Sequence, residues 1–193
     1  MRRVFLGVEC EEMKKVVWAG VVAAFFLMVG VPAAAVDGMA VEAGAGDGKG
    51  EGTDVRQVAI QWKWSRRWLQ GSDWHVGGYW DLGLGHWRRG VPADQNGEIT
   101  DIGVTPVFRL QRNSLSGPYL EGGIGFHLLS KSSLGDKQFS TLFQFSDHLG
   151  FGYRFGARDA LDLAYRYQHL SNADIKKSND GIEFHQIRLQ YHY

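Results

Sequence analysis

Cysteine is nearly absent from the 193-residue sequence, in which Cys10 is the only one. It lies in an N-terminal segment that we expect to be removed. The mature chain would then have no disulfide, no thiolate nucleophile and no cysteine for lipid attachment. Covalent chemistry, if the protein performs any, has to come from other side chains.

An excess of charge is absent too, because 21 Lys and Arg are balanced by 21 Asp and Glu. A nucleic-acid-binding protein carries a basic excess or a basic stripe, so this balance argues against a nucleic-acid partner. The seven histidines show no spacing that is typical of a metal site. We therefore predict no metal, no cofactor and no nucleic acid.

The apolar run at residues 16–31 is short for a membrane helix, which needs about 20 residues. Lys14 and Lys15 precede it and three alanines at 33–35 follow it, which is the pattern of a secretory signal peptide. The acidic residues before Met13 fit this pattern poorly, so we expect translation to start at Met13. The predicted organisation is a signal peptide, residues 1–35, and one domain, residues 36–193. A retained N-terminal anchor helix is the alternative.

A helical hydrophobic period is also missing, and proline is rare, with 4 in the chain. Hydrophobic residues instead alternate with period two, as in Val58, Ile60 and Trp62, which are separated by polar side chains. The alternation at residues 139–155 is longer than an ordinary strand of about 5 or 6 residues. A strand that crosses a membrane needs about 9 to 11. The pattern favours a transmembrane β-barrel, with a soluble β-sandwich as the alternative.

Eight strands are predicted from this alternation. They cover residues 38–47, 54–68, 73–89, 98–112, 117–129, 139–155, 159–171 and 183–193. Short connections at 69–72, 113–116 and 156–158 alternate with longer ones, as in barrels with short periplasmic turns and long external loops. The aromatic end, Tyr193, resembles the last-strand signal of outer-membrane barrels. We expect an all-β fold, an eight-stranded antiparallel barrel of the outer membrane with both termini in the periplasm.

The last two predicted strands carry three chemically suited side chains on one face. Along 159–171 the odd positions are mostly apolar, and the even positions include charged and amide groups. The odd face must point to lipid, and it includes His169 and Ser171 at the external end. The odd positions of 183–193 are apolar in the same way, so Glu183 also points outward.

These three residues are the set that nucleophilic catalysis requires. Ser171 would attack, His169 would take its proton, and Glu183 would hold the imidazole in the correct tautomer. Residues two apart on a strand are about 7 Å apart at the backbone, a gap that side chains can close. The alternative is that all three are ordinary polar residues just above the membrane.

The segment His169-Leu170-Ser171-Asn172-Ala173, with Asn179-Asp180-Gly181 and Glu183 after it, resembles the C-terminal signature of the PagL family of lipid A 3-O-deacylases. A looser resemblance extends from Gln57 to Tyr193 and includes three further motifs. These are Gly103-Val104-Thr105-Pro106, Tyr119-Leu120-Glu121-Gly122-Gly123-Ile124-Gly125 and Phe145-Ser146-Asp147-His148-Leu149-Gly150.

The resemblance implies an enzyme that hydrolyses the ester joining a 3-hydroxyacyl chain to the 3 position of lipid A. Its substrate would be lipopolysaccharide of the outer leaflet, met directly by a site on the outer wall. The resemblance also implies His169, Ser171 and Glu183 as the triad, Asn179 as a candidate oxyanion-binding residue, and Asn172 as a weaker one. A homodimer is expected on the same basis.

Two other functions stay open at this point. A purely structural or adhesive barrel would not depend on any single polar residue at its rim. A barrel acyltransferase of the PagP type would add a chain to lipid A, although no motif in this sequence matches that family. The run 179–181 is also favourable turn chemistry by itself, whatever its catalytic role.

Overall fold

The computed structural model describes residues 36–193, so the predicted signal peptide, residues 1–35, lies outside the described residues. Within the described range, no helix combines the length and the apolar character that crossing a membrane requires. The regular helical structure there consists of two single turns, η1 (Gly48–Gly50) and η2 (Ala157–Asp159).

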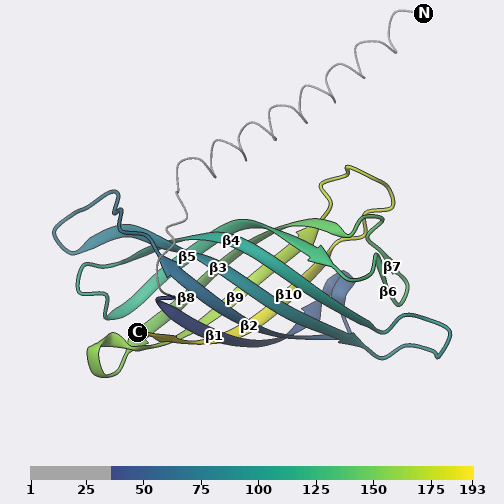
Figure 1. Ribbon diagram of the computed structural model, residues 1–193, viewed down its shortest axis with the longest axis horizontal. Helices are drawn as coiled ribbons and strands as arrows, with labels where there is room; N and C mark the ends of the chain where they lie inside the picture. The colour runs from purple at the N-terminus through teal and green to yellow at the C-terminus, as the bar shows by residue number, and fades with distance from the viewer. Residues whose placement is uncertain (1–35) are drawn as a thin grey trace, which may run out of the picture. The chain divides into compact units, whose positions relative to one another are not determined.

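Eight long antiparallel strands close into a barrel, which confirms the predicted fold class (Figure 1). Around the barrel the order is β1-β10-β9-β8-β5-β4-β3-β2. The strands are β1 (Gly38–Asp47), β2 (Thr53–Lys63), β3 (Trp74–Arg89), β4 (Glu98–Arg112), β5 (Gly117–Leu129), β8 (Phe143–Phe155), β9 (Leu161–Ser171) and β10 (Ile182–His192). A small hairpin of β6 (Ser133–Leu134) and β7 (Lys137–Gln138) lies in the connection between β5 and β8. Each long strand pairs with both neighbours, so the described sheet has no free edge.

The two ends of the barrel differ in the connections that they carry. We call the end with connections 48–52, 90–97, 130–142 and 172–181 the loop end, and it lies on the right in Figure 1. The other, the turn end, carries Tyr193 and the connections 64–73, 113–116 and 156–160. The predicted short turn at 69–72 is wrong in length, because the connection spans 64–73 and is as long as 172–181.

The predicted strand 54–68 ends early, at Lys63, because the tryptophans beyond it pack across the sheet. The Trp64 amide still donates to the carbonyl of Gly78 at 2.9 Å, and Trp68 forms an isolated bridge with Val76. The Trp64 ring lies so close to Gly78 that a Cβ atom there would be 2.3 Å from it. Only glycine at this position leaves room for the ring.

The predicted strand 139–155 is also corrected, since β8 begins at Phe143. By period two, Phe139 shares the odd, apolar face of this predicted strand with Phe143 and Phe145. Phe139 instead lies in the preceding connection and is fully buried inside the loop end. In the sequence, a buried aromatic residue of a loop cannot be distinguished from an outward residue of the following strand when both occupy odd positions.

The outer wall is apolar, as the alternation predicted. Leu149 is 74% exposed and Ile124 is 60% exposed. Many other outward residues are similarly exposed, among them Val58, Leu120, Leu128, Phe151 and Ile187. This surface is the one that an outer-membrane barrel presents to lipid.

The lumen of the barrel is filled by buried ion pairs in its middle and toward the turn end. Arg166 donates from Nε to Glu121 Oε1 at 2.6 Å, and Arg109 donates from Nη2 to the other oxygen of the same carboxylate at 2.7 Å. Arg109 also pairs with Asp162 at 2.7 Å. Arg188 bonds to Glu42 and lies 2.9 Å from an oxygen of Asp81. Each guanidinium therefore has carboxylate partners that offset the cost of burying its charge.

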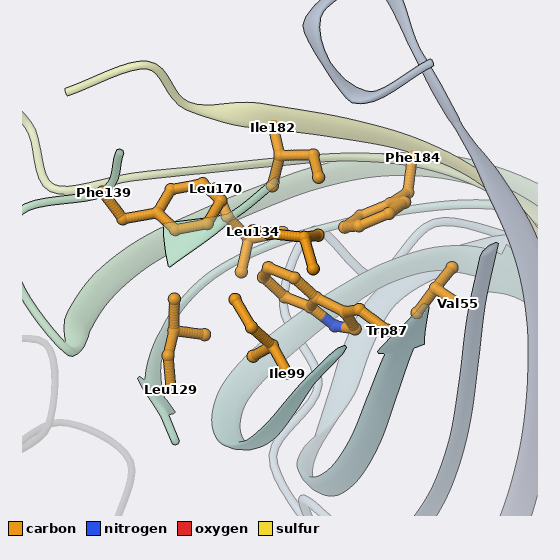
Figure 2. Packing of buried hydrophobic residues seen from close by; sticks show 9 residues of the cluster. All are labelled: Val55, Trp87, Ile99, Leu129, Leu134, Phe139, Leu170, Ile182 and Phe184. Carbon is orange, nitrogen blue, oxygen red and sulfur yellow. The ribbon is translucent and has the colours of Figure 1, made fainter. Parts of the chain in front are cut away.

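At the loop end the lumen is apolar instead (Figure 2). Trp87 lies at the centre of this apolar cluster, with its ring centroid 5.1 Å from that of Phe184 and 6.1 Å from that of Phe139. The remaining members come from five strands and from the small hairpin. They are Val55, Ile99, Leu129, Leu134, Leu170 and Ile182.

Removing one cation of the lumen network should destabilise the barrel strongly. Arg166→Met leaves Glu121 and Asp81 short of a partner in a buried site, and we expect the free energy of unfolding to fall by about 3–5 kcal/mol. Urea unfolding followed by tryptophan fluorescence measures this. The control is Arg88→Met, whose side chain is 75% exposed and whose pair with Glu98 spans 3.7 Å, so its loss should be below about 1 kcal/mol. Equal losses in the two variants would contradict the assignment.

Candidate active site

His169 and Glu183 face each other across the seam between β9 and β10. The two residues are direct register partners, and both side chains point outward, away from the lumen. His169 Nδ1 and Glu183 Oε1 are 3.2 Å apart, with the side chains 34% and 23% exposed. A carboxylate on Nδ1 leaves the Nε2 atom of His169 available as a base.

Ser171 lies two residues beyond His169 on the same face of β9, at the loop end. Its register partner on β8 is Phe145, so an aromatic ring borders the serine on the side away from Glu183. No hydrogen bond joins Ser171 to His169 within residues 36–193. Catalytic hydrogen bonds are often long in a free enzyme and shorten when substrate is bound. The structure thus brings the three predicted residues to one patch, with one of the two required contacts formed.

The residues between the polar ones anchor this patch. Leu170, which separates His169 from Ser171, points into the apolar cluster and is 1% exposed. Ile182 and Phe184, on either side of Glu183, are fully buried in the same cluster. Because neighbours on a strand point to opposite faces, fixing these three inward side chains fixes the direction of the polar ones.

The loop 172–181 is held in place by its asparagines and by the preceding loop. Asn172 is fully buried, and its side-chain amide donates to the carbonyls of Phe139 at 2.8 Å and Lys176 at 2.7 Å. The backbone amide of Asn172 donates to Asn179 Oδ1 at 3.0 Å. Gln138 and Asp180 exchange two further bonds between the loops. The loop beside Ser171 is therefore bonded to the connection 130–142, which contributes Phe139 to the buried apolar residues of the loop end.

The two candidate oxyanion-binding residues differ in what their side chains can still donate. Both side-chain hydrogens of Asn172 are used by carbonyl groups, so this weaker candidate has no hydrogen left for a substrate oxygen. Asn179 donates one hydrogen to Asp174 at 3.3 Å and keeps the other. Asn172 therefore holds the loop, whereas Asn179 keeps a side-chain hydrogen that it could donate.

Gly181 lets the chain return from the loop into β10 beside the imidazole. Its φ of +64° lies in the left-handed region that favours glycine. A Cβ atom at this position would lie 3.2 Å from His169 Cε1, closer than ordinary van der Waals contact. Glycine suits both the turn and the limited space beside His169, and a larger residue would have to displace the imidazole slightly.

Two acidic residues near the triad were not singled out from the sequence. Asp147 on β8 is the register partner of His169 on the side opposite Glu183. Asp47, at the end of β1, is the register partner of Glu183. Asp147 shares the odd positions of β8 with the exposed Leu149 and Phe151, but only the register shows that it is level with His169. Among the described residues, no three His, Asp or Glu side chains are arranged to hold a metal ion.

Comparison with known proteins identifies the family. The model of the family described as Lipid A 3-O-deacylase (PagL) matches residues 56–192, which include all five candidate residues. The chain belongs to the PagL family. It is 30% identical over 177 residues to the lipid A deacylase PagL of Pseudomonas aeruginosa, covering 91% of this chain and 96% of that one. The PagL of Bordetella bronchiseptica is 28% identical over 151 residues, covering 75% of this chain and 80% of that one.

The crystal structure of the outer membrane enzyme PagL matches the PagL-family chain with a TM-score of 0.72 and 28% sequence identity. The match covers 81% of this chain and 99% of the other. The barrel described above is therefore the family's fold, and the chain is an outer-membrane protein.

The anchoring of β9 predicts a difference between its two faces. Leu170→Ala removes a side chain from the apolar cluster, and we expect it to lower the free energy of unfolding by about 2–5 kcal/mol. Leu163→Ala removes the same group from the outward face of the same strand, where Leu163 is 48% exposed. Its effect should be clearly smaller. Urea unfolding of both variants in the same detergent measures this, and a larger loss for Leu163→Ala would contradict the anchoring role.

Proposed function

We propose that the chain is a lipid A 3-O-deacylase that removes the 3-hydroxyacyl chain from the 3 position of lipid A by a Ser-His-Glu mechanism. Membership of the PagL family makes it an ester hydrolase that acts on lipid A. One observation supports the mechanism above others, namely the bond between His169 Nδ1 and Glu183 Oε1 on the outward wall, with Ser171 on the same face.

In the first step Ser171 Oγ attacks the carbonyl carbon of the ester while His169 Nε2 accepts the serine proton. Glu183 accepts the proton on Nδ1 in a hydrogen bond and stabilises the imidazolium that forms. The carbonyl π electrons move to the oxygen and give a tetrahedral oxyanion. The free hydrogen of the Asn179 amide and backbone amides of loop 172–181 would donate to it, a contribution of about 3 kcal/mol per donor in other hydrolases.

The oxyanion then collapses and the bond to the sugar oxygen breaks. His169 gives its proton to that oxygen, which leaves as the 3-hydroxyl of deacylated lipid A. A water molecule, deprotonated by His169, attacks the acyl-serine, and a second collapse releases the fatty acid and restores the Ser171 hydroxyl. Atoms and protons balance over the cycle with water as the only co-reactant.

The place of the site fits a substrate that stays in the membrane. The three residues lie on the lipid-facing wall at the loop end, beside the exposed apolar residues of β8 and β9. We propose that the loop end faces outward, so that outer-leaflet lipid A reaches Ser171 by lateral diffusion. Lys176 and Lys177, which are exposed in the loop next to the site, suit the phosphate groups of this lipid. A homodimer remains a prediction.

Replacing the nucleophile gives the most direct test. We expect Ser171→Ala to abolish deacylation, since no other hydroxyl replaces the attacking oxygen. Mass spectrometry of lipid A from cells producing the wild type should show loss of one hydroxyacyl chain, and the variant should leave lipid A intact. Ser178→Ala, a serine in the same loop, is the matched control and should behave as the wild type. A folded Ser171→Ala variant with full activity would exclude the mechanism, and a mass gain in lipid A would indicate an acyltransferase.

Glu183→Gln tests the role of the Glu183 carboxylate separately from that of the nucleophile. The amide retains the size of the side chain but cannot stabilise the imidazolium or fix its tautomer, so we expect kcat to fall by about 10³- to 10⁴-fold. The measurement is release of fatty acid from purified lipid A in detergent. Glu98→Gln, which alters an exposed carboxylate on β4, should leave the rate unchanged. A loss of less than tenfold in Glu183→Gln would mean that the carboxylate does not orient His169.

A further inference from the structure

Four polar side chains lie on the outward wall just below the triad. His185 accepts or donates through both ring nitrogens, since Nδ1 bonds to the Tyr165 hydroxyl and Nε2 lies 3.1 Å from Asp47 Oδ2. The Tyr167 ring packs against the same imidazole, with the ring centroids 5.0 Å apart. We call Asp47, Tyr165, Tyr167 and His185 the polar patch. It joins three adjacent strands, β1, β10 and β9.

The polar patch is unusual because its surroundings face lipid. Leu149 and Ile187, next to it on β8 and β10, are 74% and 55% exposed. Ionisable groups on a lipid-facing wall cost free energy, and those that persist there mark functional sites. The proposed cycle uses none of these four side chains.

The register places the patch one row from His169 and Glu183 and two rows from Ser171. Tyr167 and His185 are partners in the row directly below His169 and Glu183, on the side toward the middle of the wall. Asp47 is level with Glu183. A row of residue pairs is about 7 Å from the next on the same face. An acyl chain that runs from an ester at Ser171 into the hydrocarbon must therefore pass beside this row.

We propose that the polar patch binds the hydroxyl group that the acyl chain carries two carbons beyond the ester carbonyl. This proposal rests on the proposed function and specifies the chain that the site selects. The Tyr167 hydroxyl, for which the described residues provide no hydrogen-bond partner, donates to or accepts from the substrate hydroxyl. His185, held by Asp47 and Tyr165, fixes the Tyr167 ring. A chain without the hydroxyl would leave this polar row facing hydrocarbon, which is unfavourable.

The chemistry of the patch suits a hydroxyl better than a charged group. When Tyr165 donates to Nδ1 of His185 and Nε2–H donates to Asp47, the Asp47 carboxylate already has a hydrogen-bond donor. Tyrosine oxygens then offer one donor and several lone pairs. A phosphate would need cations here, and the patch contains none with a fixed charge.

The test compares two substrates in variants that keep the ring shapes. Purified protein would be given lipid A glucosamine carrying at position 3 either a 3-hydroxyacyl chain or the same chain without its hydroxyl. We expect Tyr167→Phe to lower kcat/KM by about tenfold for the hydroxylated substrate and to leave the other unchanged. His185→Phe should give the same selective loss. Tyr191→Phe, on the same face of β10 far from the site, should change neither.

The outcomes separate this inference from the proposed function. An equal loss on both substrates would overturn it, because the patch would then only position Glu183. No loss on either substrate, or a wild type that does not prefer the hydroxylated chain, would overturn it as well. If the wild type cleaves neither substrate, the proposed function itself fails. Cleavage that Ser171→Ala abolishes, without selectivity in Tyr167→Phe, leaves the function intact and removes only the inference.

Discussion

In hydrocarbon every backbone N–H and C=O must find its partner within the protein, and the pairing of β1 with β10 meets this requirement by closing the sheet. Closure leaves little freedom in the rest of the structure. A closed sheet has one register at each seam, and a shift by one residue would turn every apolar side chain of a strand into the lumen. That His169 lies opposite Glu183, and Glu183 opposite Asp47, is a consequence of that register.

The side chains that fill the lumen hold the closed sheet together from inside. Ion pairs around Arg109, Arg166 and Arg188 fill the middle and the turn end, while the apolar cluster fills the loop end. This division matters for the site, because Leu170, Ile182 and Phe184 hold the strands at the point where polar residues must face lipid. Buried apolar contacts on one face thereby offset the cost of exposing His169 and Glu183 on the other.

Much of this could be predicted from period two alone, since a strand with one apolar face allows a single orientation. The eight strands, the outward direction of His169, Ser171 and Glu183, and the polar middle of the lumen follow from it, whereas the apolar loop end of the lumen does not. The pattern could not place Phe139 in the loop or end β2 at Lys63, because long-range packing against Trp87 and Gly78 decides both. The bond of His185 to Asp47 was equally hidden, because it crosses a seam between the first and last strands.

A site on the wall also changes the electrostatics of the reaction. In water, a pair such as His169 and Glu183 is weak because solvent screens it. Next to hydrocarbon, and with a lipid substrate covering His169 and Glu183 as proposed, the same pair would act in a medium of lower dielectric constant, where a charge-assisted hydrogen bond is stronger. The substrate itself would then supply the exclusion of water that other hydrolases obtain from a cleft. On the proposed function no groove is needed for this, because the substrate would reach and leave the site within the membrane plane.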